Sequence, residues 1–123
     1  MTRLALLYVD DDDDIRTVVE MALALDADIA LRVAASGAEA LTAVAGGYRP
    51  DAIVLDVMMP GMDGPAVLER LRALPATATV PVIFMTARGR QADLDFYRAR
   101  GAAGVIVKPF DPMTLPTQIR ALL

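Results

Sequence analysis

The sequence predicts an α/β fold in which a parallel sheet is covered by helices on both faces. Short apolar runs alternate five times with segments whose apolar residues recur at helical spacing. The connections are short, and no internal linker separates the units. The runs Leu4–Val9 and Ile53–Leu55 are apolar throughout, which is typical of strands buried on both faces. Together these features predict a (βα)5 order with right-handed crossovers.

Five strands are expected, and most of them end at a polar residue. Arg32 inside the second strand indicates an edge position, because an exposed charge is tolerated at the edge of a sheet. Pro81 is acceptable only near the start of the fourth strand, since it has no N–H to donate. The expected strands are Leu4–Val9, Ile29–Ala34, the run that ends at Asp56, Val80–Met85 and Gly104–Val107.

Five helices are predicted from capping residues and from apolar residues at helical spacing. Pro116 lies at or past the end of the first turn of the last helix, so we expect it to delay or kink that helix. The helix signals are a cap at Asp14, a capping box from Ser36 to Glu39, a cap at Asp63 with Pro65 in the first turn, the stretch Gln91–Arg100 stopped by Gly101, and a start at Asp111-Pro112.

Length and composition exclude several classes of protein. The chain has 123 residues, which predicts a single domain over 1–123, and 55% of them are apolar, which argues against disorder. No apolar run is long enough to span a membrane and no signal-peptide pattern opens the chain, so a cytoplasmic location is expected. Cysteine and histidine are absent, which excludes disulfides, thiolate or imidazole metal ligands, and phosphohistidine.

Charge is unevenly distributed. The net charge is -4, and five acids form one run, Asp10 to Asp14; without them the net charge would be +1. A general nucleic-acid surface is therefore not expected. Of the twelve basic residues only one is lysine, Lys108. Either this is chance, or the position needs a compact, mobile ammonium rather than a planar guanidinium.

Polar groups follow four of the five strands, namely Asp10-Asp11, Asp56, Thr86 and Lys108. The carboxyl ends of parallel strands meet at one edge of the sheet, where open α/β folds bind ligands. Carboxylates packed together raise each other's pKa unless a cation intervenes. A hard divalent cation with oxygen ligands fits, and Mg²⁺ fits best because it keeps waters and takes few carboxylates.

Such a site can hold a phosphoryl group. The metal would take one phosphoryl oxygen, Lys108 a second, and the Thr86 hydroxyl with a nearby backbone N–H the third. Asp56 would then be the nucleophile and form an acyl phosphate by in-line attack.

Simpler interpretations exist for each residue taken alone. A calcium loop at Asp10 to Asp14 would need Gly where Ile15 stands and Glu where Met21 stands. Asp12 and Asp13 are interpreted as solvated charge beyond the strand end. Thr86 alone would be a turn hydroxyl and Lys108 alone a surface lysine, but the coincidence of four strand ends favours one shared site.

Four motifs resemble the CheY-like receiver domain of two-component response regulators: VDD at 9–11, VLDVMMPGMDG at 54–64, MTAR at 85–88 and VKPF at 107–110. The resemblance covers the whole chain. It implies a flavodoxin-like sheet of order 2-1-3-4-5 and a cis Lys108-Pro109 bond. It also implies Mg²⁺ on Asp10, Asp11, Asp56 and the Met58 carbonyl, with Asp56 phosphorylated by a sensor histidine kinase or a histidine phosphotransfer protein. A downstream output protein or domain, and a monomer or weak dimer, are expected.

The sequence departs from the family pattern at two positions. Val105 stands where the family usually carries Tyr or Phe, whose ring turns inward as the threonine moves on activation. The resemblance therefore implies that Thr86 and Val105 form the switch, and that the response at Val105 is weaker because valine is small. The fourth helix and the loop Ala87 to Gln91 would then carry most of the signal. Asp13 stands where proline is frequent, and little effect is expected. Nothing follows the last predicted helix, which leaves open a stand-alone receiver or a domain cut from a longer regulator.

The motifs bear on three possible functions. A phospho-accepting signalling switch agrees with every motif. A phosphorylation-independent, receiver-like binding module would not need the complete acidic site. A phosphatase with an Asp-x-Asp motif would need an acid where Met58 stands, so turnover should be poor. We therefore expect a phosphoacceptor that catalyses its own phosphorylation and slow dephosphorylation, rather than a turnover enzyme.

Overall fold

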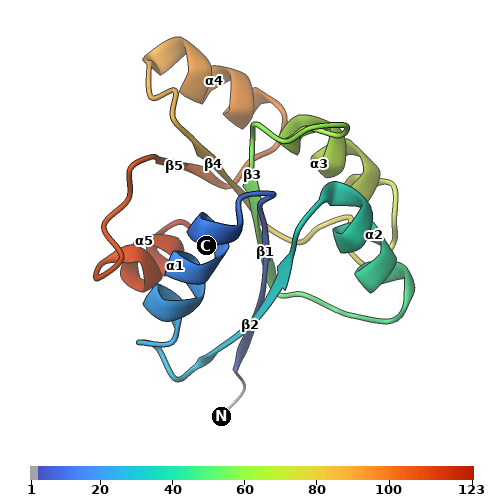
Figure 1. Ribbon diagram of the computed structural model, residues 1–123. Coiled ribbons are helices and arrows are strands. Elements are labelled where there is room, and N and C mark those ends of the chain that lie inside the picture. Colours follow the sequence, from blue (N-terminus) through green and yellow to red (C-terminus); the bar gives the residue numbers. More distant parts are fainter. Residues whose placement is uncertain (1–2) are drawn as a thin grey trace.

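The computed structural model describes residues 3–123, and within them five strands alternate with five helices (Figure 1). All neighbouring strands are parallel, in the order β2-β1-β3-β4-β5. The predicted fold class and the implied strand order are both confirmed. The strands are β1 Leu4–Val9, β2 Ile29–Ala34, β3 Ala52–Asp56, β4 Val82–Thr86 and β5 Gly104–Val107. The helices are α1 Asp13–Leu23, α2 Gly37–Ala45, α3 Gly64–Arg72, α4 Gln91–Ala99 and α5 Leu115–Ala121.

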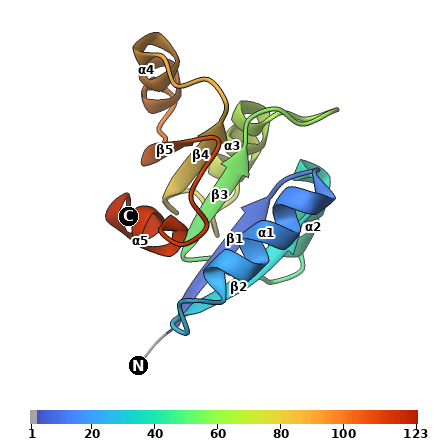
Figure 2. The same ribbon diagram turned by 60° about the vertical axis from the view of Figure 1, so that its left-hand side comes forward.

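The sheet separates two apolar layers. Alternate strand residues pack against α1 and α5 on one face and against α2, α3 and α4 on the other (Figure 2). Every residue of β3 and β4 is buried, as the continuous apolar runs predicted. Because both faces of these two strands are packed, the positions of their last residues, Asp56 and Thr86, are fixed as well.

The edge position of β2 is confirmed. Arg32 is exposed there, and its guanidinium lies over the Tyr48 ring at 4.8 Å from the centroid. The capping box is also present, with Glu39 N donating to Ser36 Oγ at 3.1 Å and the Glu39 carboxylate accepting from Ala35 N at 2.9 Å.

The predicted cap of α1 is wrong by two residues. Asp12, not Asp14, caps the helix, and its carboxylate accepts from Asp14 N at 2.9 Å and Ile15 N at 3.1 Å. Asp12 has extended backbone, whereas Asp13 and Asp14 already lie in the first turn. Asp12 is therefore more than a solvated charge, because it fixes the short turn between the strand end and the helix.

Proline accounts for two further corrections. β4 begins at Val82 rather than Val80, since Pro81 has no N–H and the Arg72 guanidinium takes the Val80 carbonyl at 2.6 Å. The strand also includes Thr86.

The last helix begins at Leu115 rather than at Asp111. Asp111 forms a turn, in which its carboxylate accepts from Met113 N at 2.9 Å and its carbonyl accepts from Thr114 N at 3.1 Å. Pro116 then falls in the first turn of α5, where proline is tolerated, so the expected delay is confirmed.

The predicted cap of α3 at Asp63 is confirmed, with Ala66 N donating to Oδ1 at 3.0 Å. The cis Lys108-Pro109 bond is confirmed as well. Across residues 3–123 no helix has the length and apolar character that crossing a membrane requires.

Candidate functional site

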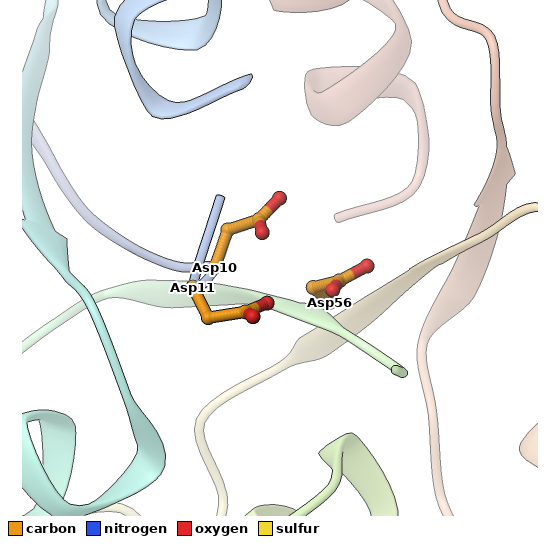
Figure 3. Close-up of side chains that lie close together, drawn as sticks. All are labelled: Asp10, Asp11 and Asp56. Atoms are coloured by element: carbon orange, nitrogen blue, oxygen red, sulfur yellow. The ribbon is translucent and has the colours of Figure 1, made fainter. Parts of the chain in front are cut away.

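The strand ends bring three carboxylates together. Asp10 and Asp11 follow β1 and Asp56 ends β3, and one carboxylate oxygen from each lies within 4.8 Å of the others (Figure 3). Asp10 and Asp56 are buried, at 0% and 4% exposed, while Asp11 is open to solvent. The sequence predicted this cluster correctly, because parallel strands end at a common edge.

Lys108 supplies a positive charge to the cluster. Its Nζ donates to Asp56 Oδ1 at 2.7 Å and lies 3.7 Å from Asp10 Oδ2. Lys108 N also donates to the Thr86 carbonyl at 2.7 Å, which holds the residue beside the end of β4. One ammonium therefore contacts two of the three carboxylates, and the formal charge of the four side chains together is negative.

Burial raises the pKa of Asp56 above its ordinary value, and the neighbouring charge of Asp10 adds to that rise. The hydrogen bond from Lys108 acts in the opposite direction but does not cancel the rise. Ionisation of Asp56 therefore costs free energy, and a bound cation would offset that cost.

Asp10 is held by contacts that the sequence analysis missed. Tyr8 Oη donates to Asp10 Oδ2 at 2.6 Å, and Asp12 N donates to Oδ1 at 2.9 Å. Arg16 Nη1 donates to the Asp10 carbonyl at 2.7 Å. Burial and the Asp10 carboxylate raise the pKa of Tyr8, so its hydroxyl stays protonated. The signal was present in the sequence, because residues two apart along a strand point to the same face.

Thr86 lies at the edge of the cluster and is 2% exposed. Its Oγ1 accepts from Arg88 N at 3.0 Å, so the hydroxyl is engaged by the loop that follows β4. Among the described residues no hydrogen bond joins Thr86 to Asp56. The hydroxyl keeps its own proton to donate, because it only accepts in the contact with Arg88 N.

The start of α3 lies close to Asp56. A Cβ at Gly64 would lie 2.8 Å from the Asp56 carbonyl oxygen and 3.1 Å from Phe84 Cε1, closer than side chains pack. Gly64 N donates to the Val57 carbonyl at 3.0 Å. Glycine is therefore required for the chain to pass beneath the site. Met58, in the intervening loop, has a side chain turned to solvent at 68% exposed.

The oxygen donors suit a hard cation. Three carboxylates converge closely enough for one ion to contact all of them, and the chain has no histidine or cysteine to favour a softer metal. The structure therefore offers a metal site at the carboxyl edge of the sheet.

The predicted switch residue Val105 is partly buried against the layer that contains Phe84 and Tyr97. Tyr97 of α4 is 6% exposed, and its ring centroid lies 5.2 Å from that of Phe84. Two aromatic rings therefore lie in this layer, Phe84 from β4 and Tyr97 from α4. The sequence analysis missed this contact because the spacing within α4 does not show which face packs on the sheet.

Comparisons with known proteins agree with this geometry. The family model of the response regulator receiver domain matches residues 6–120. Similar sequences include the transcriptional regulatory protein CseB of Streptomyces avermitilis, 41% identical over 96% of this chain and 48% of the relative. The DNA-binding response regulator MtrA of Mycolicibacterium smegmatis is 36% identical over 98% of this chain and 51% of its own. The chain spans about half the length of these curated relatives.

A solved structure of similar size is the chemotaxis response regulator CheY4 of Vibrio cholerae, which is 35% identical and superposes with a TM-score of 0.88 over 99% of this chain and 100% of that one. The chain therefore belongs to the response regulator receiver domain family of two-component signal transduction, and the resemblance inferred from the four motifs is confirmed.

Proposed function

We propose that this chain is a phospho-accepting signalling switch in which Asp56 receives a phosphoryl group at a Mg²⁺ site. The observation that carries the proposal is the position of Asp56. It ends the central strand β3, it is buried, and it lies among two further carboxylates with the Lys108 ammonium at 2.7 Å. Family membership supports this role.

Asp10, Asp11 and Asp56 are proposed to hold the cation, together with the backbone carbonyl of Met58. Mg²⁺ suits so few carboxylates because it keeps several waters in its shell. When bound, it would offset the repulsion among the carboxylates and draw charge from one phosphoryl oxygen. The exposed Asp11 leaves a side from which the ion can enter.

Transfer would proceed by in-line attack of an Asp56 carboxylate oxygen on phosphorus. The new O–P bond forms as the bond from phosphorus to the donor breaks, and the donor leaves with the electron pair. Lys108 Nζ, now on Asp56 Oδ1, would shift to a phosphoryl oxygen. A lysine can follow because its ammonium sits on a flexible stem.

Partners follow from the donor chemistry. Membership of the receiver domain family points to a sensor histidine kinase or a histidine phosphotransfer protein as the phosphodonor, in the cytoplasm. The output would be a downstream protein or domain, since the curated relatives CseB and MtrA are transcriptional or DNA-binding regulators about twice as long as this chain. Self-catalysed dephosphorylation should be slow because Met58, not an acid, lies two residues after Asp56.

Intact-mass spectrometry tests the proposal. We expect one phosphoryl group per chain after incubation with phosphoramidate or acetyl phosphate and Mg²⁺, and loss of that group in acid. A parallel sample with EDTA should gain nothing. No mass gain at any Mg²⁺ concentration would contradict the phosphoacceptor function.

The output surface is proposed to be α4 and the loop before it. A phosphoryl group on Asp56 would offer strong acceptors to the Thr86 hydroxyl, and a shift of Thr86 towards them would pull on its contact with Arg88 N. Gly89 in that loop is packed on Val107, since a Cβ there would come within 3.0 Å of Val107 Cγ1. Movement of Thr86 would thus displace this loop before other parts of the surface.

Backbone NMR with and without beryllofluoride tests the output surface. We expect the largest shift changes near Asp56 and over residues 86–97, with smaller ones at Val105, because a valine exchanges less surface than an aromatic ring. Large changes centred on Val105 and α5, with α4 unchanged, would show that the output lies elsewhere.

A further inference from the structure

A tyrosine lies directly beneath the acidic cluster. Tyr8, on β1, is 1% exposed and belongs to the apolar layer beside α1 and α5. Its Oη donates to Asp10 Oδ2 at 2.6 Å and lies 3.6 Å from Met85 Sδ. The hydroxyl is the polar end of an otherwise apolar strand, and it faces one carboxylate of the proposed metal site.

The three carboxylates differ in how the protein holds them. Asp10 accepts one neutral donor at each oxygen, from Tyr8 Oη and from Asp12 N at 2.9 Å. Asp56 accepts from the Lys108 ammonium, which lies farther from Asp10 Oδ2, at 3.7 Å, and Asp11 is open to solvent. Asp10 is therefore the carboxylate whose orientation is fixed before any ion arrives.

We propose that Tyr8 is a positioning residue that orients the Asp10 carboxylate for cation binding. The inference rests on the proposed function, in which Asp10, Asp11 and Asp56 hold Mg²⁺. The phenol fixes the rotation of the carboxylate at Oδ2 and offsets part of its charge in the absence of metal. Groups that hydrogen-bond to a metal ligand reduce the freedom that the ligand loses on binding, and their removal costs about 10- to 100-fold in metal affinity.

The simpler account is that Asp10 only satisfies a buried tyrosine hydroxyl, as buried phenols generally require a partner. On that account the hydroxyl matters for folding and not for the ion. Tyr8→Phe separates the two, because phenylalanine keeps the ring and its packing but loses the donor.

A matched control is available in the same chain. Among the described residues, Tyr48 Oη is buried without a hydrogen-bond partner, and Tyr48 lies in the layer packed on the other face of the sheet. Tyr48→Phe therefore makes the same chemical change without touching a carboxylate of the site.

The primary test is a calorimetric titration with Mg²⁺ in the absence of a phosphodonor. We expect Tyr8→Phe to raise the Mg²⁺ dissociation constant at least about tenfold, whereas Tyr48→Phe leaves it unchanged. In phosphoramidate labelling, the Mg²⁺ concentration for half-maximal rate should rise by the same factor while the rate at saturating Mg²⁺ stays within about twofold. Equal Mg²⁺ affinity in Tyr8→Phe and wild type, with both folded by circular dichroism, would overturn the inference.

A double-mutant cycle shows whether Tyr8 acts through Asp10. The effect of Tyr8→Phe on Mg²⁺ affinity should disappear in an Asp10→Asn background and persist in an Asp11→Asn background. Persistence in both would overturn the proposed route. The two proposals fail separately: wild type that binds Mg²⁺ but gains no phosphoryl group refutes the phosphoacceptor, whereas labelled wild type with an unaffected Tyr8→Phe refutes only the tyrosine.

Discussion

Two regions at opposite ends of the sheet each place an aspartate beside a basic side chain, with opposite electrostatic results. At the amino end, Arg120 of α5 holds Asp26 through two contacts, Nε to Oδ2 at 2.7 Å and Nη2 to Oδ1 at 3.2 Å. At the carboxyl end, Lys108 faces Asp10 and Asp56 together. In the first region one guanidinium pairs with one carboxylate. In the second region one ammonium is shared between two carboxylates.

The pKa values of the two regions move in opposite directions. The hydrogen bond from Arg120 lowers the pKa of Asp26, whereas burial raises the pKa of Asp56. Pairing at the surface stabilises the folded chain modestly. Burial of like charges does the reverse and leaves a site that a bound cation would stabilise. The direction of the pKa shift thus distinguishes Asp26, which is paired at the surface, from Asp56, the proposed phosphoacceptor.

The largest effect is expected when the phosphoacceptor itself is changed. Asp56→Asn should abolish the Mg²⁺-dependent mass gain, because an amide oxygen is a far weaker nucleophile than a carboxylate. Asp63→Asn is the matched control: it makes the same change seven residues later, and asparagine caps a helix as well as aspartate. Undiminished labelling of Asp56→Asn would show that another carboxylate accepts the group.

Lys108→Arg should reduce the rate of phosphorylation at least about tenfold, although the charge is kept. The compact ammonium fits between Asp56 Oδ1 at 2.7 Å and Asp10 Oδ2 at 3.7 Å, and a planar guanidinium is too large to follow a phosphoryl oxygen there. Initial labelling rates measure this, with the remote exchange Arg49→Lys as control. A Lys108→Arg variant equal to wild type in both rate and beryllofluoride response would mean that the lone lysine is chance.

A smaller effect is expected from removing one of the crowded charges. Asp11→Asn should stabilise the metal-free fold by up to about 1 kcal/mol, because Asp11 is exposed and its repulsion is screened. The same change should weaken Mg²⁺ binding. Urea unfolding and Mg²⁺ titration measure the two effects, with Glu20→Gln on α1 as a control for charge alone. A less stable Asp11→Asn with unchanged Mg²⁺ affinity would contradict the electrostatic account.

The smallest effect concerns the amino-end pair and depends on pH. Because the pKa of folded Asp26 lies below its usual 3.8, the stabilisation is present above that value and is lost as pH falls through the folded pKa. Arg120→Gln should therefore lower the thermal midpoint slightly at neutral pH and match wild type in strong acid. Arg98→Gln serves as control, because Arg98 forms no ion pair among residues 3–123. A deficit of constant size down to strong acid would mean that Arg120 acts through packing instead.

The sequence predicted the strands that are buried on both faces and the residues at their ends, because continuous apolar runs and parallel geometry leave little freedom. It misplaced element starts at Asp14, Val80 and Asp111. The start of α1 was misplaced because any of several consecutive acids could cap the helix. The start of β4 was misplaced because it depends on Pro81 and on which group donates to the Val80 carbonyl, here the Arg72 guanidinium. Other contacts at the site, such as that of the Thr86 hydroxyl with Arg88 N, depend on side-chain orientation, which composition and spacing do not specify.

The central claim is that Asp56, among three neighbouring carboxylates, forms the acyl phosphate. Borohydride reduction of the phosphorylated wild-type chain, followed by peptide mapping, tests it most directly, because reduction converts a phosphorylated aspartate into homoserine and leaves free carboxylates unchanged. We expect homoserine at position 56, with Asp10 and Asp11 intact. Homoserine at position 10 or 11, with Asp56 unmodified, would contradict it.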